Sequence, residues 1–468
     1  MATNRSPVLV LIAAYLGLFV GLIDSNAVNL ALPAIQTDLG GGVSGAQWTN
    51  DAYNVTFAAL LLTAGSLGDR FGRRSMLRSG LIVFLLASLA CALAPTLGEL
   101  LAARAVQGIG AALMLPQGLA IAAAVFPDAA GRARATAAWA MAAASAAAIG
   151  PILGGVLTDS LGWRFIFWLN APVVVLALAM SYLHLPESRD AESGGVDLIG
   201  QVLAILTLGS LTVVLVEGRA LGTAWIVCLA IAAVLGGIGL AWSGRRAAHP
   251  MIPPRFFGDS RLKVALAATF AMTFGTYGML LVNSLAFQHL RGATALTTAV
   301  AFLPMPLTYL ALIPMTNAWA RRADPACPMT AGLILMGAGM LLYAAVGPNA
   351  DLWVLQAAFV LAGAGLAMNT GPAVAMAMAA APLSRTGLTS GVVNLARLVG
   401  ITMGVAALGT VLALASGDAT TGPGFAAGAR TAVLTGGVAE LLGAVVVFGY
   451  TRTERSKDVP GTKEACHA

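Results

Sequence analysis

The stretch Gly65-Ser66-Leu67-Gly68-Asp69-Arg70-Phe71-Gly72-Arg73-Arg74 joins two apolar runs of the chain, Ala52 to Leu67 and Met76 to Ala94. Its glycines allow the ends of two helices to approach closely. Asp69 can pair with a neighbouring arginine or cap the helix that follows. The arginines suit the cytoplasmic face of a membrane, where Lys and Arg collect. The stretch therefore predicts a tight, charged turn between two membrane-spanning helices.

Apolar runs of this kind recur along the whole chain. Of its 468 residues, 58% are hydrophobic and 10% are charged, and the mean hydropathy is +0.85. This composition does not suit a soluble protein, which needs a charged surface. A helix that crosses a bilayer needs about 20 mostly apolar residues. We count fourteen such runs: Val8 to Leu32, Ala52 to Leu67, Met76 to Ala94, Leu100 to Phe126, Ala135 to Leu157, Phe165 to Leu183, Val196 to Val216, Ala224 to Trp242, Val264 to Phe287, Thr297 to Ala318, Met329 to Val346, Leu352 to Ala380, Gly391 to Ala415 and Thr431 to Tyr450.

The basic residues test whether every run crosses the bilayer, because Lys and Arg concentrate in cytoplasmic loops. With the N-terminus inside, the inner segments hold most of them: Arg5, Arg70, Arg73, Arg74, Arg78, Arg132, Arg134, Arg189, Arg245, Arg246, Arg255, Arg261, Lys263, Arg321, Arg322, Arg385, Arg452, Arg455, Lys457 and Lys463. The outer loops hold Arg164, Arg219, Arg291 and Arg430. This alternation predicts a multi-pass protein of the plasma membrane with both termini cytoplasmic. It also explains the net charge of +6 through contact with anionic lipid, without a nucleic-acid partner.

Other classes of protein require residues that this pattern does not supply. The three lysines do not follow the glycine spacing of a phosphate-binding loop, so we expect no use of ATP. The four histidines are scattered, without the His-Glu-x-x-His pattern of a metalloprotease, so we expect neither a metal site nor an enzyme. Nothing resembles the selectivity filter of a channel. The sequence therefore favours transport driven by an ion gradient or by the gradient of the solute.

The charged turn resembles the signature loop of the major facilitator superfamily and matches it at nearly every position. Six further stretches resemble the fourteen-span drug:proton antiporter branch of that superfamily: Leu22 to Pro33, Trp48 to Tyr53, Arg104 to Gly110, Gly150 to Gly155, Gly162 to Asn170 and Ser390 to Arg397. The resemblance covers essentially the whole chain. It implies an all-α membrane fold in which two six-helix bundles, residues 1–186 and 261–455, rock about a midplane cavity. Residues 187–260 would form an inserted helix pair, and residues 456–468 a cytoplasmic tail.

The resemblance also implies roles for individual residues. Ionisable residues inside a span cost roughly 2.5–3.5 kcal/mol on insertion scales, so each needs a partner or a function. For proton coupling we expect Asp24 and Arg104. For the substrate cavity and its mouth we expect Asn26, Trp48, Asp51, Tyr53, Gln107, Asn394 and Arg397. For conformational gating we expect Gly65, Gly68, Asp69, Arg70, Gly72, Arg73, Gly150, Pro151, Gly154 and Gly155.

Each of these roles has a structural alternative. Asp24 could be permanently paired with an arginine, and Arg104 could serve only in a structural ion pair. Asp51 could be a simple carboxylate at the outer interface of the membrane. The glycines of Gly150 to Gly155 could serve ordinary helix packing. For Glu440, near the middle of the last span, we expect a hydrogen bond between helices before a proton site.

The resulting hypothesis is a proton-coupled antiporter that exports small amphipathic organic compounds, such as drugs or antibiotics, by alternating access. We expect it to function as a monomer, with the proton gradient as its energy source and no cofactor. The alternative is a dedicated exporter of one endogenous metabolite, such as a self-made antibiotic. A membrane enzyme or a sensor that binds without transport is a more distant alternative.

Overall fold

The computed structural model describes residues 7–126, 129–189, 197–217, 221–247, 258–322, 324–380, 386–417 and 419–457. These residues form fifteen α-helices and, within the described ranges, no strand. The helices are α1 (Pro7–Leu39), α2 (Gly42–Phe71), α3 (Arg73–Leu93), α4 (Leu97–Val125), α5 (Ala129–Ser160), α6 (Arg164–His184), α7 (Leu198–Glu217), α8 (Thr223–Arg246), α9 (Ser260–Arg291), α10 (Ala295–Phe302), α11 (Pro304–Arg322), α12 (Ala326–Val346), α13 (Leu352–Ala379), α14 (Thr386–Ser416) and α15 (Gly422–Lys457).

Thirteen helical stretches of the described residues are long and apolar enough to cross a membrane, and α10 and α11 together form one of them. The predicted number of fourteen is not confirmed, because α2 does not qualify. That helix is long enough, but it carries Gln47, Asn50, Asp51 and Asn54, which lower its hydropathy. All four side chains are buried. In a helix enclosed by other helices, polar residues can be kept away from lipid.

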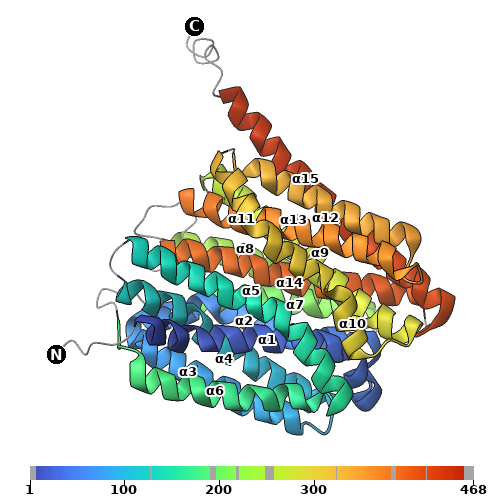
Figure 1. The fold of residues 1–468 in the computed structure, drawn as a ribbon, viewed down its shortest axis with the longest axis horizontal. Helices are drawn as coiled ribbons and strands as arrows, with labels where there is room; N and C mark the ends of the chain where they lie inside the picture. Colours follow the sequence, from blue (N-terminus) through green and yellow to red (C-terminus); the bar gives the residue numbers. More distant parts are fainter. Residues whose placement is uncertain are drawn as a thin grey trace.

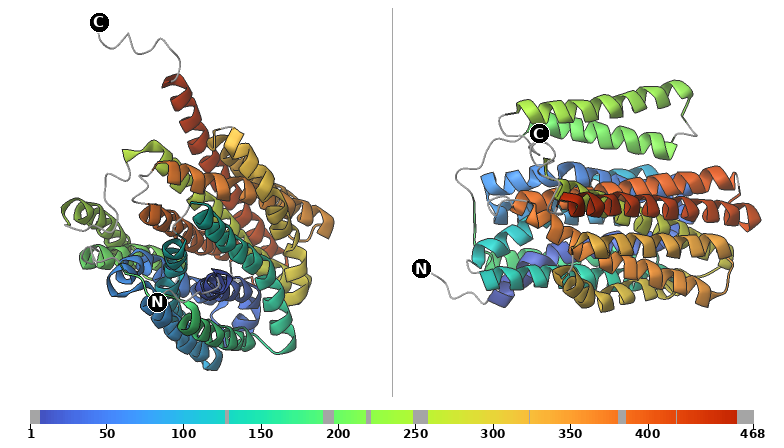
Figure 2. Two further views of the ribbon diagram at one scale, coloured as in Figure 1. Left: turned by 60° about the vertical axis from the view of Figure 1, so that its left-hand side comes forward. Right: turned by 90° about the horizontal axis from the view of Figure 1, so that it is seen from above.

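The helices run side by side in two groups (Figure 1). In the first group, α1 to α6 pack on one another, with α4 between α2 and α3 and with α1 against α5 and α6. In the second group, α9 packs on α14 and α15, and α12 packs on α13 and α15. Helices α7 and α8 form a separate pair on one side of the molecule (Figure 2). Helix α7 contacts both α2 and α14, so it lies across the seam between the two bundles.

Glycines allow α1 and α5 to pack with their backbones in close contact. A Cβ atom at Gly154 would lie 2.6 Å from the Cα of Ala27, and one at Gly150 would lie 2.8 Å from the Cβ of Asn26. Neither separation is compatible with a larger residue unless a helix moves. Pro151 lies inside α5 between these two glycines. Gly155 faces the other bundle, because a Cβ atom there would lie 2.6 Å from the Cα of Leu296.

The two bundles are joined at the end of the molecule where α1 ends at Leu39 and α2 begins, which we call the distal end. Asp159, in the last turn of α5, accepts hydrogen bonds from the first two backbone amides of α10. Its Oδ1 lies 3.0 Å from the nitrogen of Ala295, and its Oδ2 lies 2.9 Å from that of Leu296. A carboxylate at a helix N-terminus is stabilised by the free amides and by the helix dipole.

Other contacts between the bundles lie in the same distal half. Ser284 Oγ of α9 donates to the carbonyl oxygen of Asn29 at 2.7 Å, and Gln288 Nε2 donates to that of Leu30 at 3.0 Å. Gln47 Nε2 of α2 donates to the carbonyl oxygen of Ala406 on α14 at 2.7 Å. The distal end is therefore closed in this conformation.

The close contact of α1 with α5 gives a first prediction. Gly154→Ala should lower the stability of the protein, by about 1–3 kcal/mol for an overpacked site. Thermal unfolding of the purified protein in detergent would measure this loss. Gly209→Ala on α7 is a matched control, because a Cβ atom there meets nothing within 4 Å. Equal stability of the two variants would contradict the interpretation.

The closure at the distal end gives a second prediction. Asp159→Ala removes both bonds to α10 and should shift the protein towards conformations that are open at the distal end. Spin labels at Ser160→Cys and Thr297→Cys, in a background without the native cysteines, would report a longer distance between the bundles. Asp351→Ala is the control, because Asp351 lies at the same end and its side chain caps no amide of α13. An unchanged distance distribution in Asp159→Ala would show that this contact does not hold the gate.

Candidate functional site

A buried ion pair lies inside the first bundle. Asp24 of α1 and Arg104 of α4 are both fully buried, and Arg104 Nη1 lies 2.5 Å from Asp24 Oδ2. Both residues belong to stretches apolar enough to span a membrane. The free-energy cost of placing either charge there alone is offset, at least in part, when the two charges pair and their remaining polar groups are hydrogen-bonded.

The guanidinium is held by residues of α2 and α4. Arg104 Nε donates to the carbonyl oxygen of Thr49 at 3.0 Å, and Nη1 donates to Gln107 Oε1 at 2.6 Å. The ring centroid of Tyr53 lies 4.5 Å from Arg104 Cζ, which is within the range of a cation–π contact. The position of Arg104 therefore depends on how α2 packs against α4.

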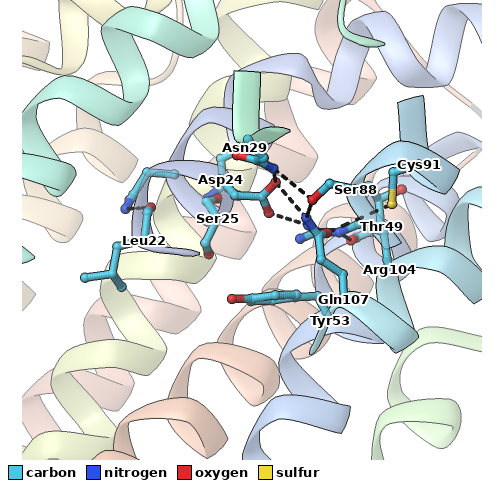
Figure 3. Close-up of polar contacts among 12 residues, drawn as sticks. Leu22, Asp24, Ser25, Asn29, Thr49, Tyr53, Ser88, Cys91, Arg104 and Gln107 are labelled. Atoms are coloured by element: carbon cyan, nitrogen blue, oxygen red, sulfur yellow. Dashed lines mark hydrogen bonds and ion pairs between the residues drawn. The ribbon is translucent and has the colours of Figure 1, made fainter. Parts of the chain in front are cut away.

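The second carboxylate oxygen of Asp24 is held by two amide side chains, and Figure 3 labels one of them, that of Gln107. Gln107 Nε2 donates to Oδ1 at 3.1 Å, and Asn170 Nδ2 of α6 donates to it at 2.7 Å. Ser88 Oγ of α3 accepts from the same two amides at 2.8 and 3.2 Å. Five helices, α1, α2, α3, α4 and α6, thus supply one polar cluster. Hydrogen bonds to a charged group are shorter and stronger than those between neutral groups.

Sequence analysis assigned roles to four members of this cluster and none to two others. It expected Asp24 and Arg104 in proton coupling and placed Gln107 and Tyr53 in the substrate cavity, whereas the structure brings all four side chains together. Asn170 and Ser88 were assigned no role. Both lie in otherwise apolar helices, and both are fully buried. An isolated polar residue in a membrane span was the signal that could have identified them.

The residues expected at the substrate mouth lie at different places. Asp51 is fully buried, not at an open interface, and neither of its carboxylate oxygens has a hydrogen-bond partner among the described residues. Trp48 Nε1 donates to Glu217 Oε1 of α7 at 2.7 Å, and Ser44 Oγ donates to the same oxygen at 2.5 Å. Trp48 therefore attaches α2 to the inserted helix pair. Tyr53 belongs to the ion-pair cluster.

The other residues expected in the cavity do not join the cluster in this conformation. Asn26 Nδ2 donates to the carbonyl oxygen of Leu22, one turn earlier in its own helix, at 2.7 Å. Asn394 and Arg397 are half-buried on α14. Within the described ranges, no carboxylate lies within ion-pair distance of Arg397. Its Nε is buried without a partner there.

The charged turn between α2 and α3 contacts other parts of the first bundle. Arg73 pairs with Asp69 at 2.8 Å, and its Nη1 donates to the carbonyl oxygen of Ala120 near the end of α4 at 3.3 Å. A Cβ atom at Gly68 would lie 2.0 Å from Gln117 Oε1, so a larger residue here would displace the Gln117 side chain. Gly72 has a φ of +104°, which also favours glycine.

One glycine of the turn does not have the contact expected for it, and one partner of the turn was not predicted. Gly65 was expected to permit a close approach, but a Cβ atom there meets nothing within 4 Å. Arg70 stacks over Phe71, with Cζ 5.3 Å from the ring centroid. Glu187, from the segment after α6, accepts a hydrogen bond from the amide of Arg74 at 3.0 Å and one from Ser75 Oγ at 2.8 Å. It therefore caps α3, a contact between distant parts of the chain that no local pattern indicates.

The ion pair gives a third prediction, for stability. Arg104→Met should destabilise the protein by about 3–5 kcal/mol, because it leaves the carboxylate of Asp24 buried without its counter-charge. Asp24→Asn combined with Arg104→Met should cost less than the sum of the two single changes. Unfolding of the four proteins in a double-mutant cycle would measure the coupling. Additive effects would mean that the two side chains do not stabilise each other.

The arrangement of the chain can be compared with known proteins. The family model of the Major Facilitator Superfamily matches residues 14–405. The multidrug resistance protein Stp of Mycobacterium tuberculosis (strain CDC 1551 / Oshkosh) is 36% identical over 402 residues, which cover 85% of this chain and 74% of Stp. The methylenomycin A resistance protein of Streptomyces coelicolor is 34% identical over 392 residues, covering 82% of this chain and 81% of that protein. The drug efflux pump JefA of Mycobacterium tuberculosis (strain CDC 1551 / Oshkosh) is 30% identical and covers 84% of this chain and 78% of JefA.

Solved structures agree in fold. A transporter of the POT family, crystallised with 5-aminolevulinic acid, superposes with a TM-score of 0.71 over 96% of both chains at 15% identity. A bacterial homologue of the human lysosomal transporter Spinster, in an inward-facing conformation, superposes with a TM-score of 0.70 over 97% of this chain and 98% of that one, at 16% identity. The family model and the relatives confirm the resemblance seen in the signature turn: the chain belongs to the Major Facilitator Superfamily.

Proposed function

We propose that the protein is a proton-coupled antiporter that exports small amphipathic organic compounds from the cell by alternating access. The observation that carries this proposal is the fully buried pair of Asp24 and Arg104. Relatives named for multidrug resistance, methylenomycin A resistance and drug efflux support the substrate class. The proton gradient would be the energy source, without ATP or a cofactor, and one chain would suffice for transport.

The pair can couple a proton to a change in conformation. In the present conformation Asp24 faces the Arg104 guanidinium and accepts N–H groups from two further side chains. A proton that binds Asp24 removes its negative charge and therefore weakens its attraction to Arg104. Asp24 lies on α1, whose next turns contact α9 through Asn29 and Leu30. Protonation can thus alter the contact between the bundles through one rigid helix.

The orientation in the membrane follows from the basic residues. The end opposite the distal end holds the start of α1 and the turn with Arg70, Arg73 and Arg74. By the positive-inside rule, we expect this end to lie on the cytoplasmic side of the plasma membrane. The closed distal end would then face outwards, and the conformation described here would be the one that takes up substrate from the cytoplasm.

A second candidate is a dedicated exporter of one metabolite. One relative, the methylenomycin A resistance protein, is named for a single compound. Transport of a panel of unrelated lipophilic dyes distinguishes the two functions, because only a multidrug exporter accepts several of them.

Asp24→Asn provides the test of proton coupling, and it is our fourth prediction. Inverted membrane vesicles with an imposed pH gradient should take up dye through the wild-type protein, and the variant should lose the part of this uptake that the gradient drives. Binding of dye should be retained, because the Asp24 carboxylate is proposed to bind the proton and not the dye. Asp351→Asn should behave like the wild type. Gradient-driven uptake by Asp24→Asn at the wild-type rate would remove Asp24 from the coupling mechanism and direct attention to Asp51.

A further inference from the structure

A second acid lies in the membrane-spanning part of the other bundle and is not part of the site described above. Glu440 lies near the middle of α15 and is fully buried. It forms no salt bridge, and neither of its carboxyl oxygens has a side-chain hydrogen-bond partner within the described ranges. The backbone of Gly275 on α9 faces the carboxyl, and the hydrogen bond between helices that we expected for Glu440 stays a prediction. An uncompensated carboxylate in such a place is costly.

The neighbouring helix is shaped to receive this side chain. Gly275 of α9 lies directly opposite, and a Cβ atom added to it would lie 2.0 Å from Glu440 Oε1 and 2.8 Å from Cδ. Any residue other than glycine would occupy the space that the carboxyl fills. One turn along α15, a Cβ atom at Gly443 would lie 2.8 Å from the Cβ of Ala271, so the two helices also approach closely next to the acid.

The surroundings of Glu440 offer no charge to balance an anion. Helix α15 packs against α9, α12 and α14. Away from the first and last turns of these helices, the titratable or charged side chains are Tyr277 on α9 and Arg397 on α14. The last turns, at the distal end, hold His289 and Arg291 on α9 and Tyr343 on α12. His289 contacts the carbonyl oxygen of Thr420 instead. Burial among apolar neighbours thus favours a carboxyl that is neutral while α9 and α15 are in contact.

Helix α9 also carries the residues that close the distal end. Ser284 and Gln288 lie two to four turns beyond Gly275 on the same helix, and they donate to carbonyl oxygens of α1. A change in the contact between α9 and α15 would therefore be passed to the seam between the bundles. Since Asp24 also lies on α1, these contacts connect Glu440 with Asp24 through α9 and α1.

We propose that Glu440 is a second proton-binding site of this transporter, located in the second bundle. The neutral acid fits against Gly275 and keeps α9 on α15. When the proton leaves for water, the carboxylate needs hydration, so α9 must move away and its hold on α1 is weakened. This inference rests on the proposed function, since it assumes that proton movement drives the transport cycle.

Glu440→Gln tests the proposal, because glutamine resembles the neutral acid in shape and cannot release a proton. The spin-label pair at positions 160 and 297 should report a distal end that opens as the pH is raised in the wild type. In Asp24→Asn, we expect part of this pH-dependent opening to remain, because Glu440 still releases its proton. In Glu440→Gln, we expect that part to be lost. Infrared difference spectra of the purified proteins, recorded over a pH titration, should lack in Glu440→Gln one protonated-carboxyl band that Asp24→Asn retains.

A second variant keeps the test informative if Glu440→Gln does not fold. Gly275→Ala leaves the acid in place but occupies its recess, and it should shift the pH dependence of opening and of dye uptake. Wild-type pH profiles in both variants, with the carboxyl band intact in Glu440→Gln, would overturn the proposal. If dye uptake by the wild type does not depend on the pH gradient, the proposed function is refuted. If uptake is driven by the gradient and Glu440→Gln transports like the wild type, only the role of Glu440 is refuted.

Discussion

The pairing of Asp24 with Arg104 is the constraint on which the first bundle depends. Two charges inside membrane-spanning helices are tolerated only when their attraction and their hydrogen bonds replace the water that they have lost. The structure supplies groups from five helices, and two of these groups, the amides of Gln107 and Asn170, bond to the same oxygen of Asp24. Arg104 Nη2 is buried without a hydrogen-bond partner among the described residues. Helix positions in this bundle are therefore fixed by polar geometry as well as by apolar packing.

The buried acids differ in how their charge is compensated. Asp24 has a counter-charge and amide donors, whereas Asp51 and Glu440 have no side-chain partner within the described ranges. A carboxylate that is fully compensated can remain ionised inside the protein, and a buried acid without partners favours its neutral form. A cycle in which protons bind and leave requires acids whose surroundings change between conformations. The three acids differ in this respect: Asp24 and Asp51 lie in the first bundle, with and without partners, and Glu440 lies in the second.

The sequence was sufficient for the parts of the structure that depend on local patterns. Apolar runs predicted the helices, and the signature turn predicted the family, because both depend on residues close together in the chain. The count of spans was less secure, since α2 is enclosed by α4, α7 and α14 and can carry polar residues that a lipid-exposed helix could not. Hydropathy measures the residues of a helix and does not reveal which neighbours cover it.

The site was predicted only where family motifs contained its residues. Asp24, Arg104 and Gln107 belong to such motifs, whereas Ser88 and Glu187 find their partners through contacts between distant helices. The same reason explains why Trp48 contacts Glu217 of the inserted pair and why Gly65 faces open space. Such contacts follow from the packing of whole helices, which no local spacing specifies.

The inserted helix pair adds a constraint to the movement of the bundles. Helix α7 is attached to α2 through Gln201, which donates to the carbonyl oxygen of Ala59 at 2.8 Å, and through Glu217. It is also attached to α14, because Thr410 Oγ1 donates to the carbonyl oxygen of Leu215. When the bundles rock, both attachments cannot be kept unless α7 tilts with them. Within the described residues, α7 has four side-chain hydrogen bonds with α2 and one with α14, so the bond from Thr410 is the one expected to break first. Helix α7 would then move with the first bundle, and the seam between α7 and α14 would open as the distal end opens.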